Sequence, residues 1–233
     1  MMIAPFLAGV SITPVAGATA APSGTALYAK ALSDAAASSG VHITGTITSS
    51  SFVQHGVEDT DQRGGTVLET IAAGSAQFAF SERLIGSKLY LNGDQDSLET
   101  QLQLDQVTAG FDAGYWRVVP TTSKYYEELS YGLNLATSID LIALAPPFTV
   151  AGPLRHDNTE AYAISSATGL HAGSGLGPGR GAFTLWVSTG RDPLPIAEVG
   201  HDVVDNTAQV IWTYFSHWGE RFVVGAPKIV KPV

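Results

Sequence analysis

Residues 181–218 read GAFTLWVSTGRDPLPIAEVGHDVVDNTAQVIWTYFSHW. Apolar and polar side chains alternate over residues 183–188, and this period of two is typical of a β-strand with two different faces. The polar segment 189–192 predicts a tight turn, and Asp205 with Asn206 predicts a second one. Residues 208–215 show the same period of two, with one apolar face and one mixed face. The stretch therefore predicts three consecutive antiparallel strands.

The composition favours a single β-rich domain around this meander. The chain has 233 residues, of which 45% are hydrophobic and only 14% are charged, so it is long enough to bury a sizeable core. The formal net charge is -9, and lysine and arginine form no cluster. Because a protein that follows phosphates needs such a cluster, we do not expect nucleic acid as a partner.

The chain contains no cysteine. This excludes disulfides, thiolate nucleophiles, sulfur-ligated metals and an acylated cysteine as membrane anchor.

Residues 1–20 differ from the rest because they carry no charge. They contain an apolar segment at 3–10 and end in the small residues Ala-Thr-Ala at 18–20, a pattern typical of a secretory signal peptide. A basic n-region is missing, and a disordered alanine-rich tail is the alternative. Pro5 and Pro14 argue against a membrane-spanning helix. We therefore expect a signal peptide at 1–20, one domain at 21–233, and a location outside the cytoplasm.

The remaining patterns predict strands and short helices in the order helix, strands, helices, strands. A polar turn region is expected at 55–65 and a glycine-rich loop at 171–181. Ser138 is expected to cap the last helix. The expected helices are 23–38, 96–107, 123–131 and 138–144, and the expected further strands are 41–49, 66–71, 76–85, 88–92, 115–119, 148–155 and 160–165. Each helix has an apolar stripe and the strands offer an apolar face, so the fold class is α+β, mainly β, with helices packed on one sheet.

Catalytic motifs are missing from the sequence. The glycine-rich loop lacks a Gly-Lys-Ser/Thr element, and no G-x-S-x-G elbow occurs. The histidines show no metal-ligand spacing, and turn positions explain them better; they are His42, His55, His156, His171, His201 and His217. We predict no catalytic residue, no metal and no cofactor, and therefore no enzyme.

Several segments together resemble a known family. They are YWRVVP at 115–120, KYYEEL at 124–129, IDLIALAPP at 139–147, TLWVSTGRDPLPIA at 184–197 and FSHWGERFVVGAP at 215–227. The chain resembles the LolA-like lipoprotein-carrier fold over about residues 23–227, and within it is most similar to the actinobacterial LppX and LprG lipid-binding lipoproteins. The most specific residues are Trp186, Leu194, Pro195, Trp218 and Gly219.

The resemblance implies an unclosed antiparallel β half-barrel wrapped around a few plug helices, with an apolar cavity that holds acyl chains. The side chains expected to line this cavity are Val41, Ile43, Ile47, Phe78, Phe80, Leu89, Leu91, Trp116, Val118, Leu141, Leu144, Leu185 and Val187. Each one alone is better explained as an ordinary core residue. On the strand at 183–188, we expect the face of Phe183 and Leu185 to point inward.

The function expected from the resemblance is that of an extracytoplasmic carrier, secreted or in the cell envelope, for a lipid or a lipid-modified protein. Its partners would be a lipid or an acylated protein, with a membrane surface or an envelope protein as donor or acceptor, and the chain would be a monomer. Members of the LppX and LprG branch are held at the membrane by a cysteine, which this chain lacks. The alternative is a sensory or protein-interaction domain of the same fold, as in RseB-like regulators, without bound lipid.

Overall fold

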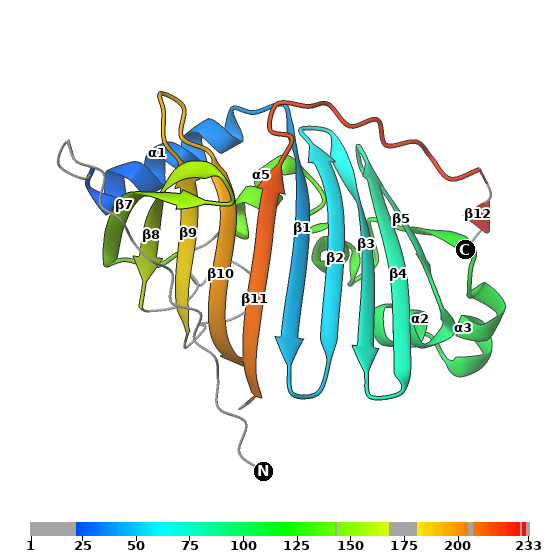
Figure 1. Cartoon of the computed structure of the whole chain (residues 1–233). Helices are drawn as coiled ribbons and strands as arrows, with labels where there is room; N and C mark the ends of the chain where they lie inside the picture. Colours follow the sequence, from blue (N-terminus) through cyan, green and yellow to red (C-terminus); the bar gives the residue numbers. More distant parts are fainter. Residues whose placement is uncertain (1–21, 143, 168–180, 205–206, 229, 232–233) are drawn as a thin grey trace, which may run out of the picture.

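A computed structural model describes residues 22–142, 144–167, 181–204, 207–228 and 230–231 (Figure 1). Its elements, in chain order, are α1 (Gly24–Ala36), β1 (Gly40–Ser49), β2 (Val53–Asp61), β3 (Gly64–Ala73), β4 (Ala76–Ile85), β5 (Lys88–Gly93), α2 (Gln95–Gln101), α3 (Gln106–Asp112), β6 (Trp116–Val119), α4 (Tyr126–Ser130), α5 (Leu135–Asp140), β7 (Phe148–His156), β8 (Thr159–Ser166), β9 (Ala182–Ser188), β10 (Pro195–Val204), β11 (Thr207–Ser216) and β12 (Val230–Lys231). The signal peptide predicted at 1–20, residues 171–180 of the predicted loop and the predicted turn at Asp205 and Asn206 lie outside the described residues.

The strands form one sheet in the order β12-β6-β5-β4-β3-β2-β1-β11-β10-β9-β8-β7. Two antiparallel meanders, β1 to β6 and β7 to β11, are joined where β1 pairs with β11 and Ile43 lies opposite Phe215. Among the described strands, the short β12 alone is parallel to its neighbour, β6. Because β7 and β12 are at opposite edges, the sheet does not close. The predicted fold class, α+β and mainly β with an unclosed antiparallel sheet, is confirmed.

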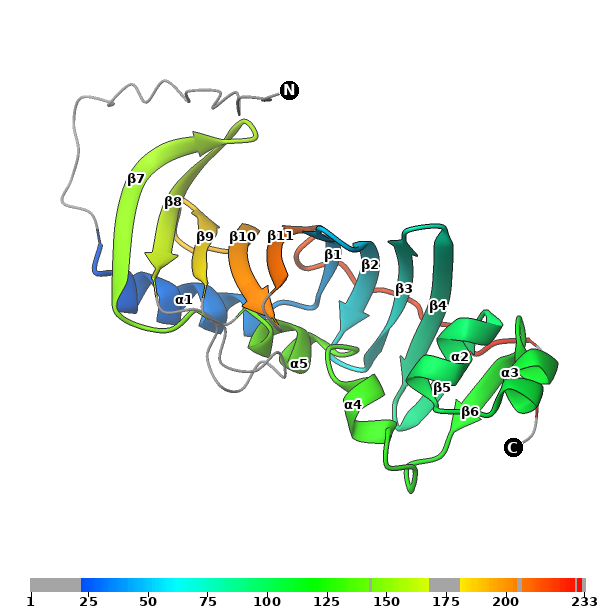
Figure 2. The ribbon, with the colours of Figure 1, turned by 90° about the horizontal axis from the view of Figure 1, so that it is seen from below.

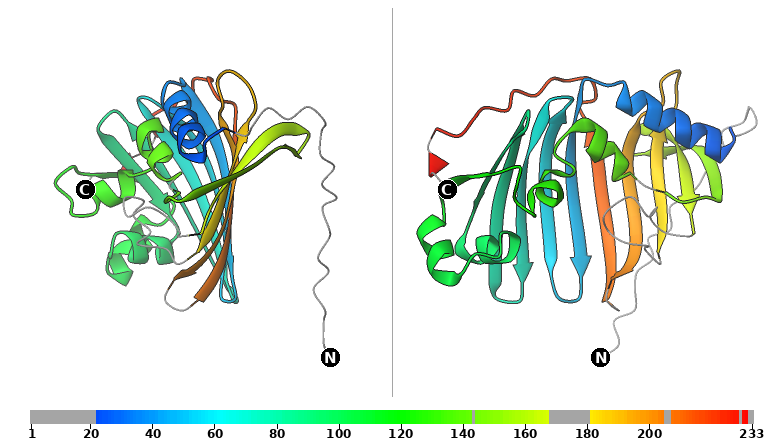
Figure 3. Two further views of the ribbon diagram at one scale, coloured as in Figure 1. Left: turned by 90° about the vertical axis from the view of Figure 1, so that its left-hand side faces the viewer. Right: turned by 180° about the vertical axis from the view of Figure 1, so that it is seen from behind.

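The helices all lie on one face of the curved sheet (Figure 2). In the view from behind (Figure 3, right), α1 lies over the end of the sheet that contains β8 and β9, α5 lies near the middle, and α2 and α3 lie at the other end. One core packs α1 and α5 against β1 and β8 to β11, and includes Leu27, Ala31, Ala35, Leu135, Ile139, Leu185 and Phe215. A second core packs α2, α3 and α4 against β3 to β6, and includes Val67, Leu84, Leu98, Ala109 and Leu129. The middle of the sheet lies between these two cores.

The predicted turn region at 55–65 is wrong, because residues 53–61 form β2. Its inward face carries Gln54, Gly56 and Glu58, so this strand has no apolar alternation by which it could be recognised.

The predicted helix boundaries also change. The single helix predicted at 96–107 is replaced by two helices, α2 and α3, which are separated by residues 102–105. Asp94 caps the N-terminus of α2 and Asp105 caps that of α3. The helix predicted at 123–131 is shortened to α4, Tyr126–Ser130. The helix predicted at 138–144 begins earlier, at Leu135, and its cap is Asn134 instead of Ser138. Ser138 is consequently free to use its hydroxyl group elsewhere.

Two of the residues that carry the family resemblance contact each other. The Nε1–H of Trp218 donates a hydrogen bond of 2.7 Å to the carbonyl oxygen of Pro195, and the Trp218 ring packs against Phe215. The N–H of Gly219 donates to the carbonyl oxygen of Gly40, which fastens the end of β11 to the start of β1. From there residues 217–228 cross the ends of the strands and lead to β12 (Figure 1).

We expect Trp218→Phe to lower the free energy of unfolding by about 1 to 3 kcal/mol, because it leaves the half-buried Pro195 carbonyl without its donor. Urea unfolding measures this change. The matched control is Trp212→Phe, which alters an exposed ring and should change stability by less than about 0.5 kcal/mol. Equal effects of the two changes would contradict a structural role for the Trp218 bond.

Candidate functional site

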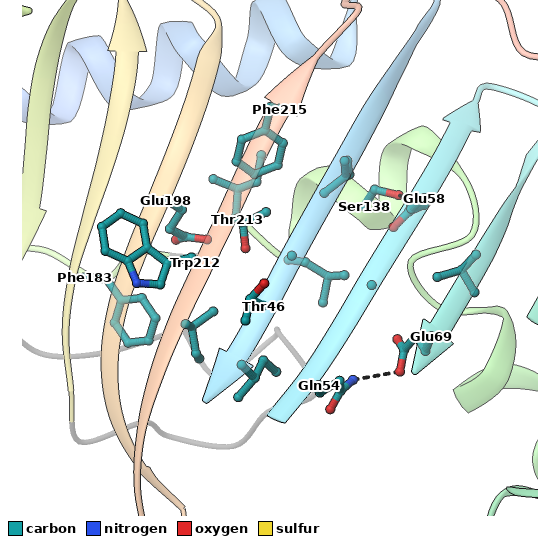
Figure 4. Close-up of a pocket in the computed structure, with 18 residues that line it drawn as sticks. Thr46, Gln54, Glu58, Glu69, Ser138, Phe183, Glu198, Trp212, Thr213 and Phe215 are labelled. Atoms are coloured by element: carbon teal, nitrogen blue, oxygen red, sulfur yellow. Dashed lines mark hydrogen bonds between the residues drawn. The ribbon is translucent and has the colours of Figure 1, made fainter. Parts of the chain in front are cut away.

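A cavity of about 230 Å³ lies over the middle of the sheet, between the two cores and next to α5 (Figure 4). β1, β2, β3, β9, β10 and β11 supply its sheet side, and α5 with the residues after it supplies the cover. The lining residues are Ile43, Gly45, Thr46, Ile47, Gln54, Gly56, Glu58, Val67, Glu69, Ser138, Leu141, Ile142, Phe183, Glu198, Ile211, Trp212, Thr213 and Phe215. Thr46 and Trp212 are paired with each other and their side chains point to the outer face; the backbone carbonyl oxygen of Trp212 lies next to Gly45.

The floor of the cavity follows from the register of five strands. Residues directly opposite each other in antiparallel strands project from the same face. One such row runs from Glu198 through Thr213, Gly45 and Gly56 to Glu69. Two glycines therefore lie side by side in the centre of the row, with a carboxyl group toward each end.

The two glycines leave bare backbone where other strands carry side chains. A Cβ atom on Gly45 would have Trp212 O as its nearest neighbour at 3.7 Å, and one on Gly56 would have Glu69 Cγ at 3.9 Å. Both are ordinary van der Waals distances, so no close packing requires glycine here. The missing side chains create the space.

The rows on either side of the glycines supply apolar walls. Phe215 and Ile43 are paired on one side, and Ile211 and Ile47 are paired on the other. Leu141 and Ile142 approach from the end of α5, and Phe183 approaches from β9. The side chains that form these walls are Ile43, Ile47, Val67, Leu141, Ile142, Phe183, Ile211 and Phe215. The cavity is thus mostly apolar, with a few polar groups at fixed positions.

Three carboxyl groups face this apolar space, and burial raises the pKa of each. Burial raises the pKa of Glu58 to about 8; the hydrogen bond with Ser138 lowers the pKa, and the charges of Glu69 and Asp59 raise it. The pKa of Glu198 rises to about 8 through burial. Burial also raises the pKa of Glu69, against the effect of the hydrogen bond of 2.7 Å that Gln54 donates to it. These groups therefore hold their protons in a range where glutamate is normally ionised.

The surroundings of Ser138 agree with a protonated Glu58. Its Oγ lies 2.7 Å from Glu58 Oε1, 2.9 Å from the carbonyl oxygen of Asn134, and within hydrogen-bond distance of the carbonyl oxygen of Gly132. A serine hydroxyl has one proton to donate, while a protonated carboxyl group can donate its own. If Glu58 donates to Ser138 and Ser138 donates to a backbone carbonyl, each proton has an acceptor.

A fourth carboxyl group, Glu82, lies directly opposite Val67 on the next strand, β4, and does not line the cavity. It is 7% exposed, and its Oε1 has no hydrogen-bond partner. Burial, together with the charges of Glu69 and Glu58, raises its pKa to about 8. Carboxyl groups from β2, β3, β4 and β10 thus lie on the inward face of the sheet, and Asp202 of β10, 3% exposed, is on the same face as Glu198.

The residues predicted to line a cavity are spread over three environments. Ile43, Ile47 and Leu141 line it. Seven others are packed in the two cores, namely Val41, Leu144, Leu185 and Val187 in the first and Phe80, Leu89 and Leu91 in the second. Phe78, Trp116 and Val118 are half-buried, and the Trp116 ring lies under the Arg83 guanidinium at 4.5 Å. The face of β9 that carries Phe183 and Leu185 is the buried one, as expected.

Sequence reasoning missed the carboxyl groups and the role of the glycines. Gly45 continues the apolar face of Ile43 and Ile47, and a glycine at such a position is a signal for close approach or open space. Glu198 lies in a segment with apolar neighbours on both sides. Only the pairing of β1 with β11, which joins distant parts of the chain, brings these residues together.

Two further searches concern only the part of the chain that the structure describes. No cluster of three or more histidine, aspartate or glutamate side chains there is arranged to hold a metal ion. No helix there combines the length and the apolar character needed to cross a membrane.

The fold and the cavity together describe an open antiparallel sheet that holds a small apolar space under a helix. No protein-family model matches the sequence, and a search of curated proteins found no match either. The site must therefore be interpreted from its own geometry.

Proposed function

We propose that this chain is a non-enzymatic binding protein that carries a lipid, or the acyl chain of a lipid-modified protein, in the cavity between β1, β2, β11 and α5. The observation that supports this most is the floor of the cavity. Gly45 and Gly56 expose bare backbone between apolar walls, although their surroundings leave room for a side chain. An ordinary core would fill this space, because protein interiors pack densely.

The size of the cavity limits what it holds. Its volume of about 230 Å³ equals that of roughly eight water molecules at about 30 Å³ each. It accommodates one short chain or chain end. Each buried methylene contributes about 0.8 kcal/mol, so such a ligand binds through burial alone with modest affinity.

The finer part of the proposal is a LolA-like carrier most similar to the LppX and LprG branch. The unclosed sheet, the helices on its concave face and the bond between Trp218 and Pro195 support it. On this proposal the chain acts as a monomer outside the cytoplasm, secreted or in the cell envelope. It exchanges its ligand with a membrane surface or an envelope protein.

A second candidate function is a sensory or protein-interaction domain of the same fold. It is favoured by a row of aromatic rings on the outer face of the sheet. His156 stacks on Trp186 with ring centroids 4.6 Å apart, and Tyr214 and Trp212 continue the row. Trp212 is 39% exposed and Tyr214 40% exposed, and aromatic rings of this kind are enriched in protein interfaces.

Two measurements on the purified full chain test the carrier function. Organic extraction followed by mass spectrometry should recover a lipid in amounts close to that of the protein. Titration with the uncharged fluorescent probe N-phenyl-1-naphthylamine should show saturable binding, since an apolar ring system fits an apolar cavity. If no lipid is recovered and the probe does not bind, the carrier function is wrong and the interaction domain is favoured.

A further inference from the structure

We propose that the cavity selects a cationic amphiphile, an amine with an apolar tail, and that Glu198 is the residue that binds the amine. This inference rests on the proposed function and names the class of ligand for the same cavity. The tail would lie against the apolar walls and over the two glycines, and the head would lie at the β10 end of the row.

Among the lining carboxyl groups, Glu198 has a buried oxygen atom that accepts no hydrogen bond. Its side chain is 6% exposed, and its Oε1 has no hydrogen-bond partner. The other two lining carboxyl groups already have partners, Ser138 for Glu58 and Gln54 for Glu69. In Figure 4 the carboxyl group of Glu198 lies at the β10 side of the cavity and that of Glu69 at the opposite side. Because a buried polar atom without a partner is costly, this oxygen indicates a place for a hydrogen-bond donor from a ligand.

The sign of the charge follows from the lining. The described residues that line the cavity include three glutamates and no lysine, arginine or histidine. The only charged side chains that an anionic head group would meet among these residues are carboxylates, whereas an ammonium group would find both an acceptor and an opposite charge. A neutral alcohol could donate one hydrogen bond but would gain nothing from the charge.

The other groups around Glu198 do not compete for this role. Its neighbours in the row are Leu185 on β9 and Thr213 on β11, neither of which titrates. Tyr28 on α1 is the titratable group that senses the charge of Glu198, and its hydroxyl already donates to the carbonyl oxygen of Ile142 and accepts from the N–H of Leu144. A ligand is the remaining source of a positive charge among the described surroundings.

Binding of an amine should also release a proton. Burial raises the pKa of Glu198 to about 8, so that the group is mainly protonated near neutral pH. An adjacent ammonium group favours the carboxylate and lowers this pKa. Glu58, Glu69 and Glu82 also lie on this face and would respond less, because they belong to β2, β3 and β4, further along the sheet.

The test is displacement of N-phenyl-1-naphthylamine from the full chain by octylamine, octanol and octanoate, which share one chain length. At about pH 7 we expect octylamine to displace the probe at concentrations at least tenfold lower than the other two. Calorimetry of octylamine binding in two buffers of different ionisation enthalpy should show release of up to one proton. Glu198→Gln should abolish both the preference and the proton release while the probe still binds.

Glu82→Gln is the matched control, because Glu82 is equally buried and also has an unpartnered oxygen but does not line the cavity. It should leave the preference for octylamine unchanged. The proposal is overturned if octylamine is no better than octanol, or if its advantage survives Glu198→Gln. If the probe itself fails to bind the unaltered chain, the proposed function fails and this inference fails with it.

Discussion

Gly56→Val is expected to abolish binding of N-phenyl-1-naphthylamine while leaving the protein folded and at least as stable. A valine side chain at this position projects into the cavity from its floor, and the nearest heavy atom to the new Cβ, Glu69 Cγ, is 3.9 Å away. Glycine in a strand costs roughly 0.5 to 1 kcal/mol, and β-branched residues favour strands, so the free energy of unfolding should rise by up to about 1 kcal/mol. Probe titration and urea unfolding of the same samples measure both effects.

Gly45→Val provides an independent repeat of this experiment, since a Cβ at Gly45 has no neighbour closer than 3.7 Å. Thr44→Val is the control, because Thr44 precedes Gly45 in β1 and points to the opposite face. It should leave probe binding unchanged. Loss of stability by several kcal/mol with either glycine variant would show that the space is part of a tightly packed core, as expected from overpacking. Undiminished probe binding would place the ligand elsewhere.

The stability of the protein is expected to fall as the pH rises from about 5 to about 8. The pKa values of Glu58, Glu82 and Glu198 are raised from 4.5 to about 8, chiefly by burial. Below about pH 4.5 these groups are protonated in both the folded and the unfolded state and do not lower the free energy of unfolding. Between the two pKa values the folded state binds protons that the unfolded state has released, so stability is lost with rising pH until the folded pKa is passed. Each group contributes a slope of about 1 kcal/mol per pH unit.

Urea unfolding between about pH 5 and pH 9 tests this expectation, because the slope follows from the difference in bound protons. Glu82→Leu should flatten the slope by about one third and stabilise the protein at high pH, since it removes one of three such carboxyl groups. Repeating the series in about 1 M salt separates this effect from repulsion between exposed charges, which salt screens strongly. A stability that stays constant or rises over this range would contradict the burial of ionisable groups on the inward face.

Alternation predicted β9 and β11, because strands with one buried and one exposed face show a period of two, and the two predicted turns between them placed β10. The same rule failed for β2, whose inward face carries Gln54, Gly56 and Glu58. A strand that lines a cavity with polar groups loses the pattern by which strands are recognised. Similarly, Ser138 has the chemistry of a cap, but it lies inside α5 and its hydroxyl group contacts Glu58 and the carbonyl oxygens of Gly132 and Asn134.

The site was less predictable than the fold. An apolar residue on an inward face is equally consistent with a solid core and with a cavity wall, and only Ile43, Ile47 and Leu141 of the expected set belong to the wall. What distinguishes the two is the absence of side chains at Gly45 and Gly56, which matters only once β1, β2 and β11 are placed next to each other. Pairing of strands that are far apart in the chain cannot be deduced from local periodicity.

A crystal structure of the full chain grown with octylamine is the most direct test of the central claim, that this cavity holds an apolar ligand. The account predicts electron density for the octyl group between Ile43, Ile211 and the backbone of Gly45 and Gly56. The amine nitrogen should lie within hydrogen-bond distance of Glu198. A cavity closed by rearranged side chains, or one filled only by ordered water, at a ligand concentration that saturates probe displacement would contradict it.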